Sequence, residues 1–288
     1  MRWPDGHPAL VDDALIPWTA GADELCPDAE VCTVLRYVSG RRVASLVRTH
    51  DDHLVLKVFS SPRARGNHRR LSQLAQSGAA PIAPRSLGCD RSGHVSLVRF
   101  TPGETYDQLD DDRFVAVAGG IGDALRRLHT ADIAFDRSWT FDDEVTQLRR
   151  RMLPEMEAAV AEATRRWAGL ADDALVTAHR DFHPRQVVVD GDHVRLVDLD
   201  DAANAPAGLD LGNFTAHLWC EAAKGRRSGD VCRRAIGSFL EGYGPLAEPV
   251  QHGLAGWEAL ALLRLASLAT TRHGRPDWTE NIKELVNR

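Results

Sequence analysis

Two acidic residues flank a short valine-rich segment in the middle of the chain. Asp181 precedes the apolar run Val187–Val189, and Asp198 follows the apolar run Val194–Val197, with the turn Asp190-Gly191-Asp192 between them. Two apolar runs around a glycine-containing turn predict a β-hairpin, whose ends lie side by side. Two carboxylates held close would raise each other's pKa unless a cation lay between them. Since oxygen ligands suit magnesium, the pattern indicates a Mg²⁺ site.

The same residues resemble a known enzyme group. His179-Arg180-Asp181, with an amide side chain at Gln186, is similar to the catalytic loop of protein-kinase-like enzymes. Val197-Asp198-Leu199-Asp200 is similar to the metal-binding strand end that follows that loop. The variant His-x-Asp-x-His-Pro and the later Leu-Asp-Leu-Gly of residues 209–212 resemble the aminoglycoside phosphotransferase and choline kinase branch.

This resemblance implies an ATP-dependent phosphotransferase that moves the γ-phosphate to a hydroxyl of a small molecule. Aminoglycoside-like antibiotics, amino sugars and related metabolites are the implied acceptors, with antibiotic resistance as one role. Asp181 would orient the hydroxyl and accept its proton. Asp198 and Gln186 would bind Mg²⁺, with Gln186 standing where the family has the shorter Asn. Asp200, expected on the other side of an extended segment, would be a second metal ligand or an acceptor contact.

A lone lysine in an early strand fits the same interpretation. Leu54–Phe59 reads as an apolar strand with Lys57 at its centre. Burying an unpaired ammonium is costly, and a phosphate anion would compensate it. The resemblance therefore assigns Lys57 to the nucleotide phosphates; the alternative is an edge-strand lysine that faces water.

The usual acidic partner of this lysine is missing. The kinase family carries a Glu on the following helix, but no Asp or Glu occurs between Asp52 and Asp90. Neutral hydrogen-bonding partners would have to replace it, and the candidates are Asn67, His68 and Gln73. With Gln186, this gap supports an alternative function, a pseudokinase-like nucleotide-binding module with weak or no catalysis.

The first part of the chain predicts a sheet. Strands are expected at Val31–Val38, Arg42–Thr49, Leu54–Phe59, Ser86–Leu87 and Val95–Phe100, which make a five-stranded antiparallel sheet. A helix is expected at Arg65–Gln76, and another near Pro8–Leu15.

Two backbone segments of this part complete the expected nucleotide site. Backbone N–H groups at Ser39 and Gly40 would cradle the phosphates. Backbone atoms of Val98 and Phe100, just before the break at Pro102-Gly103, would hold the adenine.

The rest of the chain reads as helical. Helices are expected at Phe114–His129, at Leu209–Cys220, Arg233–Tyr243 and Trp257–Thr270, and within Trp139–Trp167. Pro154 should kink or start the helix within Trp139–Trp167. The fold class is therefore α+β, a bilobal protein-kinase-like fold. Residues 1–100 would form the β-rich nucleotide-binding lobe, and residues 101–288 the helical catalytic and acceptor-binding lobe.

Histidines around the loop permit another hypothesis. His179 and His183 lie four residues apart with Asp181 between them, as in some metallohydrolases. Pro184 disfavours the continuous helix that such spacing requires. We favour structural roles, with His179 hydrogen-bonded to backbone, Asp210 buttressing the loop and His129 ending its helix.

Bulk properties exclude several classes of protein. The 288 residues are 43% hydrophobic and 26% charged, with a net charge of −6 and no apolar run long enough to span a membrane. No signal-peptide core opens the chain, so a cytoplasmic protein is expected. Residues 30–80 carry +6 and residues 101–173 carry −7, a division that suits a polyphosphate and a cationic acceptor respectively. Nucleic acid is disfavoured as a partner, because no basic run interleaves with aromatics.

Overall fold

The computed structural model describes residues 16–50, 52–167 and 174–286. The chain divides into two compact units, Met1–Pro102 and Gly103–Arg288. The helix expected near Pro8–Leu15 lies outside the described residues, and the helix that follows begins at Ile16. Among the described residues no helix is both long and apolar enough to cross a membrane.

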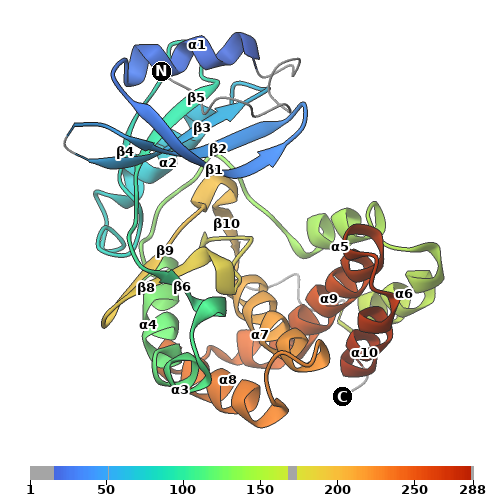
Figure 1. Cartoon of the computed structure of the whole chain (residues 1–288). Helices are drawn as coiled ribbons and strands as arrows, with labels where there is room; N and C mark the ends of the chain where they lie inside the picture. The colour runs from blue at the N-terminus through green and yellow to red at the C-terminus, as the bar shows by residue number, and fades with distance from the viewer. Residues whose placement is uncertain (1–15, 51, 168–173, 287–288) are drawn as a thin grey trace. The chain divides into compact units, whose positions relative to one another are not determined.

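A five-stranded antiparallel sheet forms the centre of the first unit, with the strand order β1-β2-β3-β5-β4 (Figure 1). The elements are α1 (Ile16–Leu25), β1 (Glu30–Val38), β2 (Arg42–Arg48), β3 (His53–Phe59), α2 (Ala64–Leu74), β4 (Ser86–Cys89) and β5 (Val95–Arg99). The predicted sheet is confirmed. Short turns join β1 to β2, β2 to β3 and β4 to β5, whereas β5 pairs with β3 across α2 and β4.

Side chains alternate between the two faces of this sheet, and one face is more buried than the other. Leu54, Leu56 and Val58 are buried on one face of β3, whereas Val55 and Lys57 on the other face are half-buried. The buried face joins a cluster that includes valines and leucines of β2 and β5 and residues of α1. Lys57 is therefore placed on the less buried side of the sheet, opposite this core.

The second unit is mostly helical and contains two small sheets. Its strands are β6 (Glu104–Thr105), β7 (Leu175–Ala178), β8 (Val187–Asp190), β9 (His193–Leu196) and β10 (Ala203–Pro206). Its α-helices are α3 (Asp111–Ala116), α4 (Ala118–His129), α5 (Phe141–Arg149), α6 (Glu157–Arg166), α7 (Ala207–Ala223), α8 (Gly229–Tyr243), α9 (Glu248–His273) and α10 (Pro276–Val286). Strands β6, β8 and β9 form one sheet, and β7 pairs with β10 in the other.

Two predicted helices are each divided. The single helix expected at Phe114–His129 breaks at Val117, whose ψ of −8° departs from helical geometry, and α3 and α4 result. The long helix expected within Trp139–Trp167 becomes α5 and α6. Its break lies at Leu153-Pro154, where the residue before proline is extended and the proline begins a new turn. The effect expected of Pro154 is therefore confirmed, whereas apolar periodicity continued across Val117 and did not reveal the first break.

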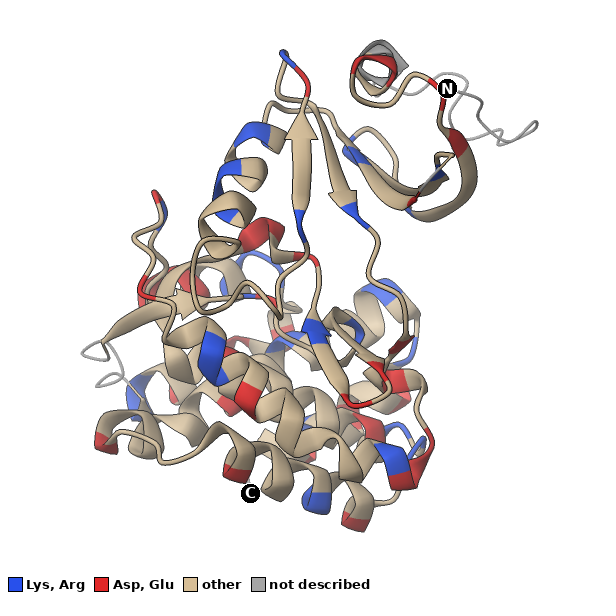
Figure 2. Ribbon diagram, turned by 90° about the vertical axis from the view of Figure 1, so that its left-hand side faces the viewer, with Lys and Arg blue, Asp and Glu red and all other residues tan. Residues whose placement is uncertain are grey.

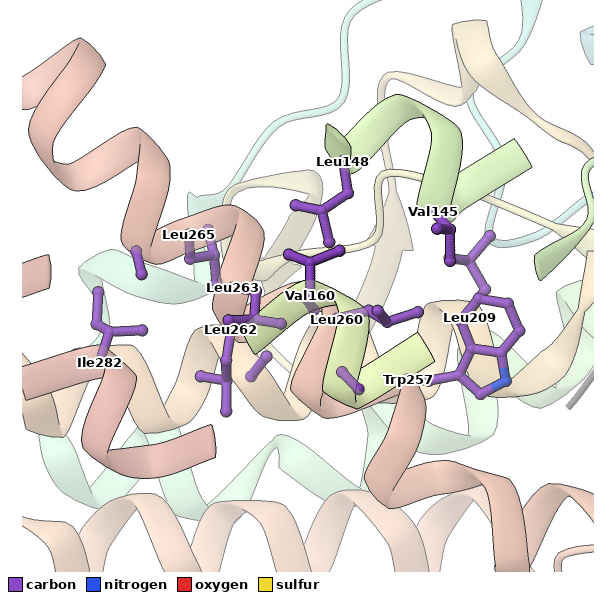
Figure 3. Packing of buried hydrophobic residues seen from close by; sticks show 14 of the residues in the cluster. Val145, Leu148, Val160, Leu209, Trp257, Leu260, Leu262, Leu263, Leu265 and Ile282 are labelled. Atoms are coloured by element: carbon purple, nitrogen blue, oxygen red, sulfur yellow. The ribbon is translucent and has the colours of Figure 1, made fainter. Parts of the chain in front are cut away.

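A large hydrophobic cluster holds α5, α6, α7, α9 and α10 together (Figure 3). Trp257 of α9 is fully buried within it and packs edge-on against Phe141. Two glycines of α7 let this indole approach closely, because a Cβ at Gly208 would lie 2.3 Å from the indole Cδ1 and one at Gly212 would lie 2.6 Å from the Trp257 Cβ. The glycine of Leu-Asp-Leu-Gly therefore serves packing between α7 and α9.

Candidate active site

The predicted hairpin forms and joins two of the predicted site residues. Val187 pairs with Leu196 and Asp190 with His193, while Gly191 has the positive φ of 56° that the turn requires. One step beyond the ladder, the Val197 amide donates to the Gln186 carbonyl at 2.8 Å. This pairing brings Gln186 Nε2 to 3.5 Å from Asp198 Oδ2.

The backbone of the loop that contains Asp181 is fixed by Asp210. The Oδ2 atom of this buried side chain accepts a hydrogen bond from the His179 amide at 2.6 Å, and its Oδ1 accepts one from the Arg180 amide at 2.7 Å. His129 Nε2 lies 3.1 Å from the same Oδ2. Burial raises the pKa of Asp210, but the hydrogen bonds and charge of its partners outweigh burial and hold it below the usual range. Asp210 therefore buttresses the loop as an anion.

Two histidines, His179 and His129, make structural contacts near this loop. His179 Nε2 lies 2.9 Å from the Val197 carbonyl, which links the loop to the strand before Asp198. His129 Nδ1 contacts the Tyr243 hydroxyl at 2.8 Å. Within the described part of the chain no three His, Cys, Asp or Glu side chains are grouped to hold a metal ion.

Asp181 stands at the exposed side of this framework. Its side chain is 47% exposed, and its two carboxylate oxygens lie 4.0 Å from Arg264 Nη1 and 3.9 Å from His183 Nε2. His183 Nδ1 accepts a hydrogen bond from the Arg185 amide, so its Nε2 carries the proton. Burial lowers the pKa of His183 to about 4, so the imidazole is neutral at neutral pH.

The imidazole of His217 adds a second neutral ring beside His183. The two ring centroids are 4.9 Å apart. Burial, together with the positive charge of Arg264, lowers the pKa of His217 well below its ordinary value. Arg264 is consequently the cation that accompanies Asp181 in this arrangement.

Asp198 and Asp200 lie in a tight turn. The segment Leu199–Asp201 forms a 3₁₀ turn, so the expectation that Asp200 lies on an extended segment is wrong. Asp198 itself adopts the left-handed conformation with φ 58° and ψ 44°, which a non-glycine residue rarely takes. Arg180, beside Asp181, has φ 71°. Strained backbone at both positions is typical of functional sites.

The donor set at the end of the hairpin fits magnesium. Gln186 and Asp198 offer an amide and a carboxylate oxygen, which are the hard ligands that Mg²⁺ prefers. The Gln186 atom that lies 3.5 Å from Asp198 Oδ2 is the amide nitrogen Nε2, so the amide would have to turn over to present its oxygen beside this carboxylate. Magnesium characteristically takes its remaining ligands from water and substrate phosphates, so a complete protein cage is not required.

The predicted nucleotide residues of the first unit lie on its sheet. Lys57 pairs through its backbone with Ala44 and Ser96 at the centre of β3. Ser39 and Gly40 form the turn between β1 and β2, where Gly40 has φ 64°.

Val98 and Phe100 lie on the last strand of this unit and just beyond it. Val98 is buried within β5, and the Phe100 amide already donates to the His53 carbonyl at 3.1 Å. A ring bound at this strand would therefore have to use backbone groups other than the Phe100 amide.

Two residues expected to replace the missing acid on α2 have other contacts. Asn67 Oδ1 accepts a hydrogen bond from Arg70, and His68 Nδ1 lies 2.8 Å from the Ser86 hydroxyl. Both side chains thereby tie α2 to itself or to β4.

Several residues around Asp181 escaped sequence analysis. They are Arg264, Asn213, Trp139 and His217, and they come from α7, α9 and the segment before α5. One signal was present, because Arg264 interrupts the apolar run Leu260–Ala269 just as Lys57 interrupts its strand. The others carry no such signal, since their contacts depend on how distant elements pack.

The model of the phosphotransferase enzyme family matches residues 34–263. This match covers most of the chain, which therefore belongs to that family and is a phosphotransferase. Curated protein sequences gave no significant match.

Solved structures show the same fold. The crystal structure of an aminoglycoside-3'-phosphotransferase of type VIII is 20% identical, with 88% of this chain and 100% of that chain covered and a TM-score of 0.65. A ternary complex of aminoglycoside phosphotransferase APH(4)-Ia with AMP-PNP and hygromycin B is 16% identical, with 93% and 97% covered and a TM-score of 0.64. A choline/ethanolamine kinase family protein from Mesorhizobium loti is 15% identical, with 84% and 83% covered and a TM-score of 0.58. At these identities the likeness establishes the protein-kinase-like fold.

Proposed function

We propose that this phosphotransferase transfers the γ-phosphoryl group of ATP to a hydroxyl of a small molecule. The observation that carries the proposal is the loop and hairpin that gather three groups around His183. Its Nε2 lies 3.9 Å from Asp181 Oδ2 and 3.4 Å from Gln186 Nε2, and the same Gln186 nitrogen lies 3.5 Å from Asp198 Oδ2. Both ends of this motif have left-handed backbone at non-glycine residues, as expected of a site that is held in place for chemistry.

In the proposed reaction Asp181 is the base. Its carboxylate accepts a hydrogen bond from the acceptor hydroxyl and takes the proton as the oxygen bonds to the γ-phosphorus. The bond between that phosphorus and the β–γ bridging oxygen breaks, and ADP leaves with the electron pair. Positioning and charge neutralisation carry most of this catalysis. Magnesium bound by Asp198 and Gln186, with Asp200 as a further candidate ligand, would neutralise phosphate charge.

The nucleotide assignment rests on residues of the first unit. We assign Lys57 to the phosphates, the Ser39–Gly40 turn to backbone contacts with them, and backbone of Val98 and Phe100 to the adenine. The APH(4)-Ia structure with AMP-PNP supports nucleotide as the phosphoryl donor. The same proposal divides the protein into two parts. Residues 1–100 would bind the nucleotide, and residues 101–288 would carry the catalytic residues.

The acceptor is a small hydroxylated compound, and an aminoglycoside or amino sugar is the first class to test. Structural neighbours include an enzyme bound to hygromycin B and a choline/ethanolamine kinase family protein. Acidic and basic residues are interspersed over the helices of the second unit (Figure 2), so surface charge by itself does not select a polycation. The corresponding biological role is inactivation of an antibiotic in the cytoplasm.

A nucleotide-binding module with weak catalysis is the second candidate. Gln186 is one methylene longer than the Asn of the family, and no acidic residue occurs between Asp52 and Asp90. Both features change groups that position phosphates, so binding could persist where turnover is slow. Tight nucleotide binding without turnover on any acceptor would favour this candidate.

The decisive experiment measures acceptor-dependent ADP release over a panel of aminoglycosides, amino sugars, choline-like alcohols and neutral sugars. With a reactive acceptor, Asp181→Asn should reduce kcat about a thousandfold, because the general base is lost. Asp192→Asn changes an exposed acid in the hairpin turn and should leave kcat unchanged. Retention of full activity by Asp181→Asn would contradict the proposed mechanism.

A further inference from the structure

Arg264 occupies an unusual position for a charged residue. It lies in the apolar middle of α9, between the buried Leu263 and Leu265, and only 17% of its side chain is exposed. A guanidinium in such a place is stabilised only if partners compensate its desolvation. Its partners all lead to three consecutive residues of the catalytic loop.

One set of contacts holds the backbone that follows Asp181. Arg264 Nη2 donates a hydrogen bond to Asn213 Oδ1 on α7. The Nδ2 atom of the same Asn213 donates to the Phe182 carbonyl at 2.8 Å. Since Asn213 is almost completely buried, this bridge connects α9 through α7 to the loop without water.

A second set holds the residue before Asp181. Arg264 Nε lies 3.9 Å from Glu144 Oε1, and the other oxygen of Glu144 accepts a hydrogen bond from Trp139 Nε1 at 3.0 Å. The Trp139 ring in turn lies beneath the Arg180 guanidinium, 3.6 Å from its carbon. Stacking on an aromatic face is a favourable position for arginine.

The third contact reaches Asp181 directly, since Arg264 Nη1 lies 4.0 Å from its Oδ1. We propose that Arg264 is a positioning residue that fixes the carboxylate of Asp181 for phosphoryl transfer. It acts with Asn213, Glu144 and Trp139, which together we call the loop clamp. The inference rests on the proposed function, in which Asp181 is the base.

The physical reason is that a half-exposed carboxylate is otherwise free to rotate. Asp181 is 47% exposed, so packing alone does not select one rotamer. The Arg264 guanidinium lies 4.0 Å from one oxygen and His183 Nε2 lies 3.9 Å from the other, and both neighbouring residues are anchored, so the rotation of this carboxylate is restricted. A displacement of the catalytic carboxylate by about 1 Å lowers the reaction rate about a hundredfold.

The test uses variants that separate positioning from folding. Arg264→Met removes the charge and keeps length and helix propensity, but it leaves the buried Glu144 carboxylate without this partner. The double variant Arg264→Met with Glu144→Gln removes both charges, while the amide oxygen introduced at position 144 still accepts from Trp139. Arg264→Lys keeps the charge without the planar fork. Arg272→Met, an exposed position on the same helix, is the matched control.

With the reactive acceptor, the double variant should lose about a hundredfold in kcat and keep its KM for ATP, with a thermal midpoint close to that of the wild type. Arg264→Lys should recover part of the lost kcat, and Arg272→Met should match the wild type. A double variant with wild-type kcat would overturn the inference. So would an equal loss in Arg272→Met.

Hydrogen exchange gives a readout that does not depend on turnover. Peptides that cover residues 179–184 should exchange faster in the double variant, whereas peptides of the first unit should be unchanged. Unchanged exchange at 179–184 would overturn the loop clamp even in a protein without detectable turnover. The two proposals can also fail separately. If the wild type turns over no acceptor but loop exchange is faster in the double variant, the proposed function is contradicted and the clamp is still supported.

Discussion

At the scale of single residues, the carboxyl group of Glu258 in the second unit lies where burial disfavours its ionised form. Glu258 of α9 is largely buried, and burial raises its pKa above the ordinary value, although hydrogen bonds with Thr215 and Trp219 act in the opposite direction. The folded protein therefore holds this proton more tightly than the unfolded chain does. Stability consequently falls as pH rises from the unfolded pKa through the folded pKa, and the penalty is fully present above both.

Glu258→Gln should remove this penalty. The amide oxygen still accepts hydrogen bonds, but no buried charge forms at neutral pH. Urea unfolding at pH 4 and pH 7 should show a variant that is more stable than the wild type at pH 7, with a smaller gain at pH 4.

The exposed Glu248 at the start of the same helix provides the control, because Glu248→Gln buries no charge in either form. A gain from Glu258→Gln that is the same at both pH values would show that burial of the charge is not its cause.

At the scale of elements, the contact between α4 and α8 depends on glycine. A Cβ built at Gly122 would lie 2.0 Å from the Phe239 carbonyl oxygen and 2.5 Å from the Tyr243 amide nitrogen. One built at Gly242 would lie 2.0 Å from the Gly119 carbonyl oxygen. The two backbones therefore touch where neither helix has a side chain. This contact also places His129, at the end of α4, beside Tyr243 and Asp210.

Gly122→Ala should be strongly destabilising, because backbone atoms cannot move aside as a flexible side chain would. We expect a loss of about 3 kcal/mol in unfolding free energy, measured by urea denaturation.

Gly237→Ala is the matched change within α8, where a Cβ would meet nothing within 4 Å. It should stabilise the protein by about 0.5–1 kcal/mol, since alanine favours a helix interior over glycine. Equal effects of the two substitutions would disprove the close backbone contact.

At the scale of the whole molecule, each unit has a hydrophobic core of its own. One buried cluster consists of residues from α1 to β5, and another joins residues from Phe141 to Ile282. Each unit therefore supplies much of its own stability, and a ligand that binds only the folded chain adds to it by mass action. The proposed nucleotide residues include Lys57 in the first unit and Asp198 in the second.

Magnesium and AMP-PNP at a hundred times the dissociation constant should stabilise the wild type by about 2.7 kcal/mol. Lys57→Met and Asp198→Asn should each reduce this gain, measured by denaturation with and without ligand. Lys283→Met, which removes only a surface lysine paired with Glu280, should retain the full gain. A full gain in both Lys57→Met and Asp198→Asn would disprove their assignment to the nucleotide.

The sequence predicted the secondary-structure elements correctly where the signal was local. The strands of the first sheet, the hairpin around Gly191 and the helices α7 to α9 all follow from apolar periodicity and turn residues. The break at Pro154 followed from the proline itself, but the division at Val117, the short β7–β10 pair and α10 were not predicted. The first division carries no proline or glycine at the break, and β7 and β10 are four-residue strands that pair across a long loop.

The sequence by itself determined the class of protein, because motifs that resemble those of the family place an acid, an amide and a second acid at fixed steps along one hairpin. Only the tertiary structure decided how Asp181 is held, since Arg264, Asn213, Glu144 and Trp139 come from elements far apart in the chain. Their contacts arise when α5, α7 and α9 pack around Trp257. Local patterns encode strands and turns, whereas the meeting of distant side chains depends on the shape of the completed core.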